Sequence, residues 1–140
     1  MNRVHSSTSA EETIAIGRKL AEQIKGGAFI ALHGDLGAGK TTLIKGLAAG
    51  LCGQAERGVN SPTFTYLHIY PGIVPLFHFD LYRIKDEEQF LQLGFLDYFE
   101  AGGVCCVEWA ERIPTLLPEK RINITICHTA DGRDITVDGL

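Results

Sequence analysis

The segment from Gly34 to Thr41 carries the clearest chemical signal in the sequence. It reads Gly-Asp-Leu-Gly-Ala-Gly-Lys-Thr and matches the pattern G-x-x-x-x-G-K-[ST] in full. Its glycines keep side chains away, so that backbone N–H groups can surround a polyphosphate. Lys40 can reach the β- and γ-phosphates, and Thr41 can offer its hydroxyl to Mg²⁺. The segment therefore predicts a nucleoside triphosphate site, and the alternative is a glycine-rich turn without a ligand.

Such a loop needs a strand before it and a helix after it, because the positive end of the helix must face the phosphates. The apolar run from Ala28 to Leu32 is typical of a strand buried on both faces. After the loop, apolar residues from Leu43 to Leu51 recur with the period of a helix. The residues expected to contact the nucleotide here are Asp35, Leu36, Gly37, Ala38, Gly39, Lys40, Thr41 and Thr42.

Two acidic residues follow apolar runs and are candidate magnesium ligands. Glu108 ends the run that begins at Val104, and Asp80 ends the run that begins at Leu76. A charge at the end of a buried strand is costly unless it meets a cation, and the carboxyl ends of strands in α/β sheets are where ligands bind. We therefore predict that Asp80 and Glu108 act with Lys40 at a catalytic magnesium site. The alternative for either acid is a surface carboxylate.

The remaining segments indicate an α/β fold with a central, mostly parallel sheet, flanking helices and antiparallel hairpin additions. Ser9 to Glu12 has the form of a capping box and begins a helix. Pro75 suggests an edge strand or a bulge, and Gly94 interrupts a helix capped by Asp86. Aromatic residues near Gly94 are expected to belong to the core. The expected ranges are a helix over 10–25, strands over 63–70, 73–79 and 104–107, and a closing hairpin over 122–126 and 135–137.

Length and composition set further limits. The 140 residues suit one domain spanning 1–140. With 13 Lys and Arg against 17 Asp and Glu, the net charge is −4, which disfavours direct capture of nucleic acid. We find no signal peptide or bilayer-spanning run and expect a cytoplasmic protein without membrane contact. The dispersed histidines and four cysteines are expected to be structural, the cysteines as small core side chains.

The chain resembles the TsaE (YjeE-like) family of P-loop ATPases in bacterial tRNA threonylcarbamoyladenosine (t6A) biosynthesis. The resemblance covers nearly the whole chain, and the motifs occur in the family's order and spacing. These motifs are GDLGAGKTT at 34–42, SPTF at 61–64, HFDLYR at 78–83 and VEWAER at 107–112. A minor departure is Ala110, where the family often has proline.

This resemblance implies a P-loop NTPase fold and an ATPase that works with the TsaB and TsaD proteins. TsaD would perform the carbamoyl transfer, and tRNA would contact this chain only indirectly. Thr41 and Glu108 would bind Mg²⁺, and Asp80 would act near the metal or the attacking water. The resemblance also implies a switch-like loop with an adjacent tryptophan, and three further nucleotide contacts. These are Ser61, Pro62, Thr63 and Trp109 for the switch-like group, and Ser9, Ala10 and Arg133 for the nucleotide contacts.

Other functions remain open at this point. A free-standing kinase would need a mobile lid with arginines, and no segment has that character. A GTPase would need an N-K-x-D segment, which is absent. The third alternative is a nucleotide-dependent binding switch with incidental hydrolysis. Residues 58–79 contain no Asp, Glu, Lys or Arg and are the candidate for coupling to a partner, or else form a hydrophobic hairpin packed on the core.

Overall fold

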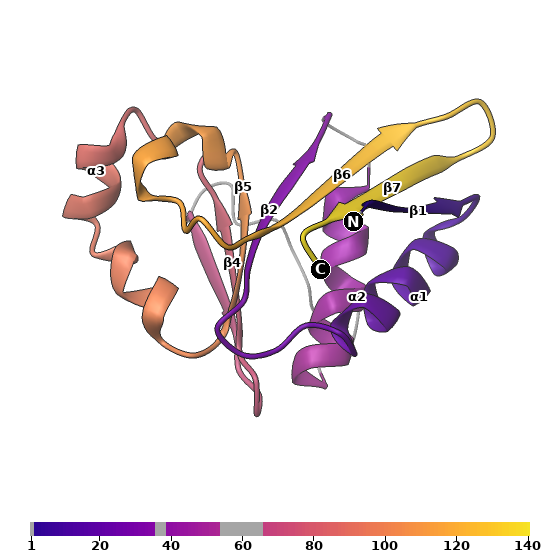
Figure 1. Cartoon of the computed structure of the whole chain (residues 1–140), viewed down its shortest axis with the longest axis horizontal. Coiled ribbons are helices and arrows are strands. Elements are labelled where there is room, and N and C mark those ends of the chain that lie inside the picture. The colour runs from indigo at the N-terminus through magenta and orange to yellow at the C-terminus, as the bar shows by residue number, and fades with distance from the viewer. Residues whose placement is uncertain (1, 36–38, 54–65) are drawn as a thin grey trace.

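A seven-stranded sheet organises the computed structural model, which describes residues 2–35, 39–53 and 66–140 (Figure 1). The strand order is β1-β7-β6-β2-β5-β4-β3. Helices α1 (Ala10–Ala21) and α2 (Lys40–Cys52) lie on one side of the sheet, and α3 (Glu87–Gln92) lies on the other (Figure 1). The strands are β1 (Asn2–Ser7), β2 (Phe29–Gly34), β3 (Leu67–Tyr70), β4 (Leu76–Asp80), β5 (Val104–Glu108), β6 (Ile122–His128) and β7 (Arg133–Asp138).

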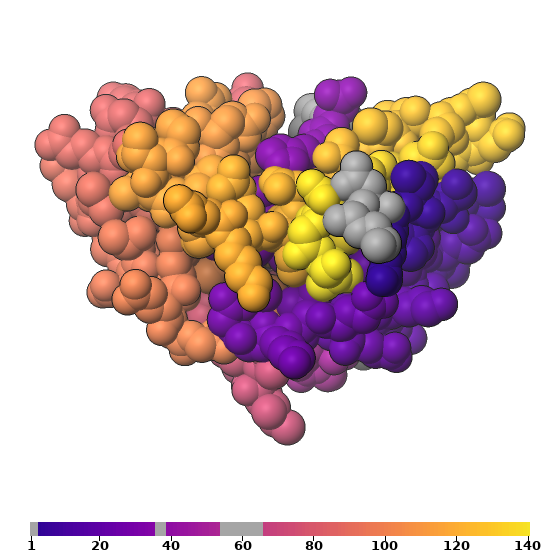
Figure 2. Space-filling model, viewed as in Figure 1, coloured from indigo at the N-terminus to yellow at the C-terminus, as the bar shows by residue number. Residues whose placement is uncertain are grey.

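The sheet is mixed, and the expectation of a mostly parallel centre with antiparallel additions is confirmed. The four central strands β6, β2, β5 and β4 run parallel, whereas β1, β7 and β3 pair antiparallel at the two sides. Strand β1 was not predicted, because it has few apolar residues and Val4 is 61% exposed. As an edge strand it is held by pairing with β7. The N-terminal and C-terminal segments accordingly lie side by side (Figure 2).

Helix α1 begins where the capping box predicts. The Ser9 side chain accepts a hydrogen bond from the Glu12 N–H at 3.1 Å, and Glu12 accepts one from the Thr8 N–H at 3.2 Å. The helix ends at Ala21 and not near residue 25, because the following backbone bonds span three residues. One of them joins the Ile24 N–H to the Ala21 carbonyl at 3.3 Å. This tighter turn places Ile24 in the core and directs the chain toward β2.

Strands β3 and β4 differ from the predicted strands in their bounds. Pro75 lies just before β4, and its carbonyl accepts a hydrogen bond from the Val104 N–H at 2.9 Å. Strand β4 lies between β5 and β3, so the edge position inferred from Pro75 is wrong, and the edge is β3. Residues 63–65 of the predicted strand lie outside the described residues. The expected interruption at Gly94 is confirmed, and a 3-10 helix follows at Phe95–Glu100.

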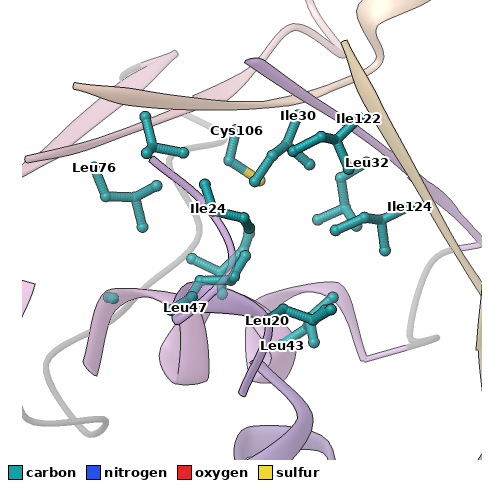
Figure 3. Packing of buried hydrophobic residues seen from close by; sticks show 14 of the residues in the cluster. Leu20, Ile24, Ile30, Leu32, Leu43, Leu47, Leu76, Cys106, Ile122 and Ile124 are labelled. Atoms are coloured by element: carbon teal, nitrogen blue, oxygen red, sulfur yellow. The ribbon is translucent and has the colours of Figure 1, made fainter. Parts of the chain in front are cut away.

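Helices α1 and α2 form one half of the core through an unusually close crossing. A Cβ at Gly46 would collide with the Ile14 carbonyl oxygen and lie 2.9 Å from the Gly17 Cα. The helix pair is therefore close enough for Leu20 and Leu43 to meet side by side beneath the sheet (Figure 3). This packing sets the position of α2, and with it the position of the residues at its N-terminus.

We predict that Gly46→Ala destabilises the fold. Alanine favours a helix over glycine by about 1 kcal/mol, but the collision with backbone atoms of α1 forces the helices apart and costs about 1–3 kcal/mol. Urea unfolding is expected to show a net loss of stability. Ala49→Gly, at a half-buried position of the same helix, gives a reference value for the difference in helix propensity. A Gly46→Ala variant that is more stable than the parent would contradict the close crossing.

The opposite face of the sheet packs on a cluster of aromatic rings. Phe79, at 0% exposure, has its ring 5.5 Å from that of Phe95 and 5.8 Å from that of Phe99. Phe90 of α3 is equally buried and lies 6.2 Å from the same ring. The prediction that these aromatic residues belong to the core is confirmed. Side chains alternate along β4, so Phe77 and Phe79 face this cluster, whereas Leu76 and His78 face the side of the sheet that α2 covers.

The cysteines are all free, but their environments differ. Cys105 and Cys106 are buried as expected, Cys52 is partly buried, and Cys127 is exposed, so the core assignment is wrong for Cys127. Burial raises the pKa of the Cys105 thiol to about 12. That thiol also donates a hydrogen bond to the Tyr98 carbonyl at 3.4 Å. Across the three described ranges, no helix combines the length and apolar character that a membrane crossing requires.

The raised pKa of Cys105 predicts a loss of stability at alkaline pH. Above about pH 9 the thiol ionises in the unfolded chain, while the folded protein keeps its proton until about pH 12. Unfolding therefore becomes easier by about 1.4 kcal/mol per pH unit for this group. Urea midpoints measured between pH 8 and 10.5 should fall less steeply in Cys105→Ala than in the parent. The exposed Cys127→Ala serves as the control, and an equal slope in Cys105→Ala would refute the prediction.

Candidate functional site

The glycine loop leads directly into α2, as the sequence predicts. Gly39 caps the helix with φ at 104°, a left-handed conformation that favours glycine, and its carbonyl accepts the Leu43 N–H at 3.0 Å. Lys40, Thr41 and Thr42 form the first turn of α2, where free backbone N–H groups favour an anion. Asp35 is exposed after β2. The expected contacts at 36–38 lie outside the described residues.

Arg133 of β7 lies against this turn. A Cβ at Gly39 would lie 3.0 Å from Arg133 Nε and 3.1 Å from its Cδ. The Nε atom is buried without a hydrogen-bond partner among the described residues. Arg133 also pairs with Ser7 of β1, close to Ser9 and Ala10 at the start of α1. The sheet thus brings the C-terminal hairpin and the start of α1 to the same edge as the glycine loop.

The two predicted acids lie side by side at the end of the central sheet. Strands β4 and β5 are parallel, and their register places Asp80 opposite Glu108. The exposed fractions of these residues are 6% and 5%. Side-chain alternation turns both toward α2, on the same face as Leu76 and Cys106. This register could not be read from either strand separately.

The two oxygens of the Glu108 carboxylate have different partners. Oε1 lies 3.3 Å from Lys40 Nζ, and Oε2 lies 2.7 Å from His78 Nε2. Burial alone raises the pKa of Glu108, but the hydrogen bond and charge of His78 and the charge of Lys40 outweigh it. The pKa therefore lies below its ordinary value, and Glu108 is ionised at neutral pH. A buried carboxylate at the end of a strand, beside a lysine that follows the glycine loop, is suited to a divalent cation.

Asp80 has a second, distinct environment. Its Oδ1 accepts a hydrogen bond from the Tyr82 N–H at 3.1 Å, and its own N–H donates to the Tyr66 carbonyl at 2.9 Å. These bonds hold the end of β4 and direct the carboxylate beside Glu108. Both candidate acids are therefore positioned by the strand ends and by local hydrogen bonds.

Trp109 lies beside Lys40, immediately after β5. Its backbone is left-handed, with φ at 61°, which is rare for a bulky residue. Lys40 Nζ is 5.8 Å from the centre of its ring, Arg112 Cζ is 5.4 Å away, and the Tyr82 ring is 5.0 Å away. The Arg112 guanidinium also donates to the Tyr82 carbonyl at 3.2 Å. A continuous group of cations and rings thus joins Lys40 to the exposed Tyr82.

Comparison with known proteins assigns the chain to a family. Residues 7–135 match the family described as "Threonylcarbamoyl adenosine biosynthesis protein TsaE". The chain belongs to the TsaE family. It is 47% identical to the "tRNA threonylcarbamoyladenosine biosynthesis protein TsaE" of Bacillus subtilis (strain 168), over 93% of this chain and 81% of that protein. It is 42% identical to the protein of that name in Treponema pallidum (strain Nichols), over 94% of this chain and 96% of that one.

A solved structure supports the same assignment for the fold. The solved structure titled "Crystal structure of Bacillus subtilus YdiB" is 40% identical to this chain in sequence and superposes with a TM-score of 0.78. The match covers 98% of this chain and 84% of that one. The mixed sheet and its flanking helices are therefore an arrangement that this TsaE-family chain shares with a solved structure.

The structure places the predicted site residues of this TsaE-family chain in several positions. The structure brings together Lys40, Glu108, Asp80 and Trp109, and it places Arg133 against Gly39. Ser9 lies at the start of α1, where its side chain caps the helix. The switch-like residues Ser61, Pro62 and Thr63 lie outside the described residues, as do all residues from 58 to 65 of segment 58–79.

Sequence reasoning missed His78, which it assigned only a structural role. His78 is completely buried and contacts Glu108 directly. A signal was present, because residues two apart on a strand share a face and His78 lies two residues before Asp80. That spacing predicts that both side chains turn toward the same helix.

Proposed function

We propose that this chain binds and hydrolyses ATP with Mg²⁺ as the ATPase component of tRNA t6A modification. The observation that carries the proposal is the ion pair between Lys40, in the first turn of α2, and the buried Glu108, at the end of the adjoining strand. It joins the two parts that a P-loop NTPase needs, a phosphate-binding lysine and a metal-binding acid. Membership of the TsaE family, which is described as acting in threonylcarbamoyl adenosine biosynthesis, supports the biological process.

The residues present fit a nucleoside triphosphate. The N-terminal turn of α2 offers N–H groups, and the buried Arg133 Nε beside Gly39 lacks a partner among the described residues. A polyphosphate would satisfy both kinds of donor. Lys40 would turn from Glu108 toward the β- and γ-phosphates, which leaves the Glu108 carboxylate available to a cation. Gly39 gives the anion access to the backbone. We accordingly propose a P-loop NTPase fold.

The donor set also fits magnesium. Mg²⁺ prefers hydroxyl and carboxylate oxygens, which Thr41 and Glu108 would supply, and Asp80 lies opposite Glu108 on the adjacent strand. When bound, the ion neutralises charge that develops on the transferred phosphoryl group. Asp80 would orient the attacking water, and Lys40 would hold the phosphate oxygens. The surrounding strands keep both acids largely out of bulk water.

We also propose that the ATPase works with TsaB and TsaD in the cytoplasm and that tRNA does not bind this chain directly. The net charge of −4 supports the last part, because binding to a phosphate backbone relies on a positive field. A protein partner would then have to couple ATP hydrolysis to the modification of tRNA.

Phosphate release and nucleotide-dependent pull-down test this function together. The chain is assayed with ATP and Mg²⁺ alone, with TsaB, with TsaD and with both proteins, and Lys40→Ala is the control for contaminating ATPases. We expect the parent to release phosphate and to respond to both partners, with binding that differs between ATP and ADP. Hydrolysis that ignores the partners, with binding that ignores the nucleotide, would favour a free-standing phosphohydrolase or kinase. Nucleotide-dependent binding without hydrolysis would favour a binding switch.

A further inference from the structure

His78 is an unusual residue for the place it occupies. It lies in β4 between β5 and β3, at 0% exposure, and it faces the same side of the sheet as the apolar residues Leu76 and Cys106. Its Nδ1 is buried with no hydrogen-bond partner among the described residues. A buried polar atom without a partner lowers stability. Core packing alone therefore does not explain a histidine at this position.

The Nε2 atom of His78 has one well-defined contact. It lies 2.7 Å from Glu108 Oε2, a short distance for a hydrogen bond between nitrogen and oxygen. An ionised carboxylate only accepts hydrogen bonds, so Nε2 carries the hydrogen and donates it. The imidazole is enclosed by neighbouring strands and approaches Glu108 from the protein interior.

The other oxygen of Glu108, Oε1, has a partner that can move away. Oε1 pairs with Lys40, whose side chain is 11% exposed and belongs to the phosphate-binding turn. If Lys40 turns toward a phosphate, the pair with Oε1 is lost, while the contact between His78 and Oε2 is retained. One oxygen is thus anchored to the core, and the other is directed toward the candidate nucleotide site.

We propose that His78 is a positioning residue that anchors Glu108 through Oε2 and so keeps Oε1 directed toward the magnesium ion. The effect on magnesium binding depends on the proposed function, whereas the contact between His78 and Glu108 is given by the structure itself. Hydrogen bonds behind a metal ligand orient it, and their loss commonly costs 10–100-fold in metal affinity or activity. His78 would act only through Glu108 and would touch neither the nucleotide nor the metal.

Two substitutions at His78 separate positioning from packing. His78→Gln keeps an N–H donor that can reach Glu108, whereas His78→Leu removes it and leaves an apolar side chain that suits the core. His68→Leu is the matched control, because His68 lies directly opposite His78 in β3 but contacts the Tyr70 hydroxyl. Urea unfolding of each variant reports its effect on stability.

The activity readouts are phosphate release and the Mg²⁺ concentration needed for half-maximal binding of a fluorescent ATP analogue. We expect His78→Leu to lose about 10–100-fold in both, even where it is as stable as the parent. His78→Gln should recover most of the loss, and His68→Leu should behave as the parent. In a Glu108→Gln background, His78→Leu should cost little more, because its target carboxylate is already gone.

A measurement without nucleotide tests the hydrogen bond between His78 and Glu108 independently of ATP hydrolysis. In protein labelled with ¹⁵N-histidine, we expect a slowly exchanging imidazole N–H signal that disappears in His78→Gln and shifts in Glu108→Gln. Lack of that signal, unchanged Mg²⁺ dependence in His78→Leu, or a full additional loss in the Glu108→Gln background would overturn the inference. A parent protein that shows the signal but does not hydrolyse ATP would instead overturn the proposed function, and Mg²⁺-dependent binding would then decide the positioning role.

Discussion

Replacing Lys40 with alanine is expected to reduce ATP hydrolysis by on the order of 10²–10³-fold or more. The substitution removes the charge that would hold the β- and γ-phosphate oxygens as negative charge shifts during transfer. It also leaves Glu108 without the ion pair at 3.3 Å, although the hydrogen bond to His78 at 2.7 Å remains. The local fold should persist, because Lys40 is at the start of α2 and outside the core.

Lys45→Ala provides the matched control for this prediction. It removes a lysine from the same helix but lies outside the first turn, so its rate should stay close to that of the parent. Phosphate release measures the rate, calorimetry with ATP measures binding, and circular dichroism checks the fold. A Lys40→Ala variant with parental activity would show that the glycine loop is not the phosphate site.

Local features of this site could be predicted from the sequence because each depends on a short stretch of chain. The glycine loop, the apolar run before it and the helical period after it lie within residues 28–51. Asp80 and Glu108 could be chosen as candidates because each ends an apolar run, and the structure confirms that each ends a buried strand. Capping of α1 by Ser9 depends on four consecutive residues and was equally predictable.

Features that depend on contacts between distant segments were not predictable in the same way. The register that pairs Asp80 with Glu108 follows from the strand order, which no single strand encodes. Strand β1 has almost no apolar signal, since its partner β7 supplies the hydrogen bonds. The close approach of Gly17 and Gly46 joins two helices whose glycines look unremarkable in the sequence. Each of these three features nevertheless helps to position the candidate site.

Conversion of Glu108 to glutamine is expected to impair magnesium binding and hydrolysis together, the latter by about 10²-fold or more. Glutamine keeps the shape of the side chain but offers an NH₂ group in place of one oxygen. Lys40 and the His78 Nε2–H both donate toward this position, so the new NH₂ must face a donor whichever way it turns. The loss therefore has two sources, the missing charge at the metal and the mismatched hydrogen bond. Glu111→Gln, an exposed neighbour, is the control.

Asp80→Asn should give a different pattern, with a larger effect on hydrolysis than on nucleotide binding. The asparagine carbonyl can still accept the Tyr82 N–H now bound at 3.1 Å, so the end of β4 should keep its shape. What is lost is the negative charge beside Glu108, which we assign to the metal environment and the attacking water. Calorimetry with ATP, with and without Mg²⁺, and phosphate release separate the two acids. The reverse pattern would exchange their roles, because the acid that binds the metal directly must be the one whose loss weakens Mg²⁺-dependent binding most.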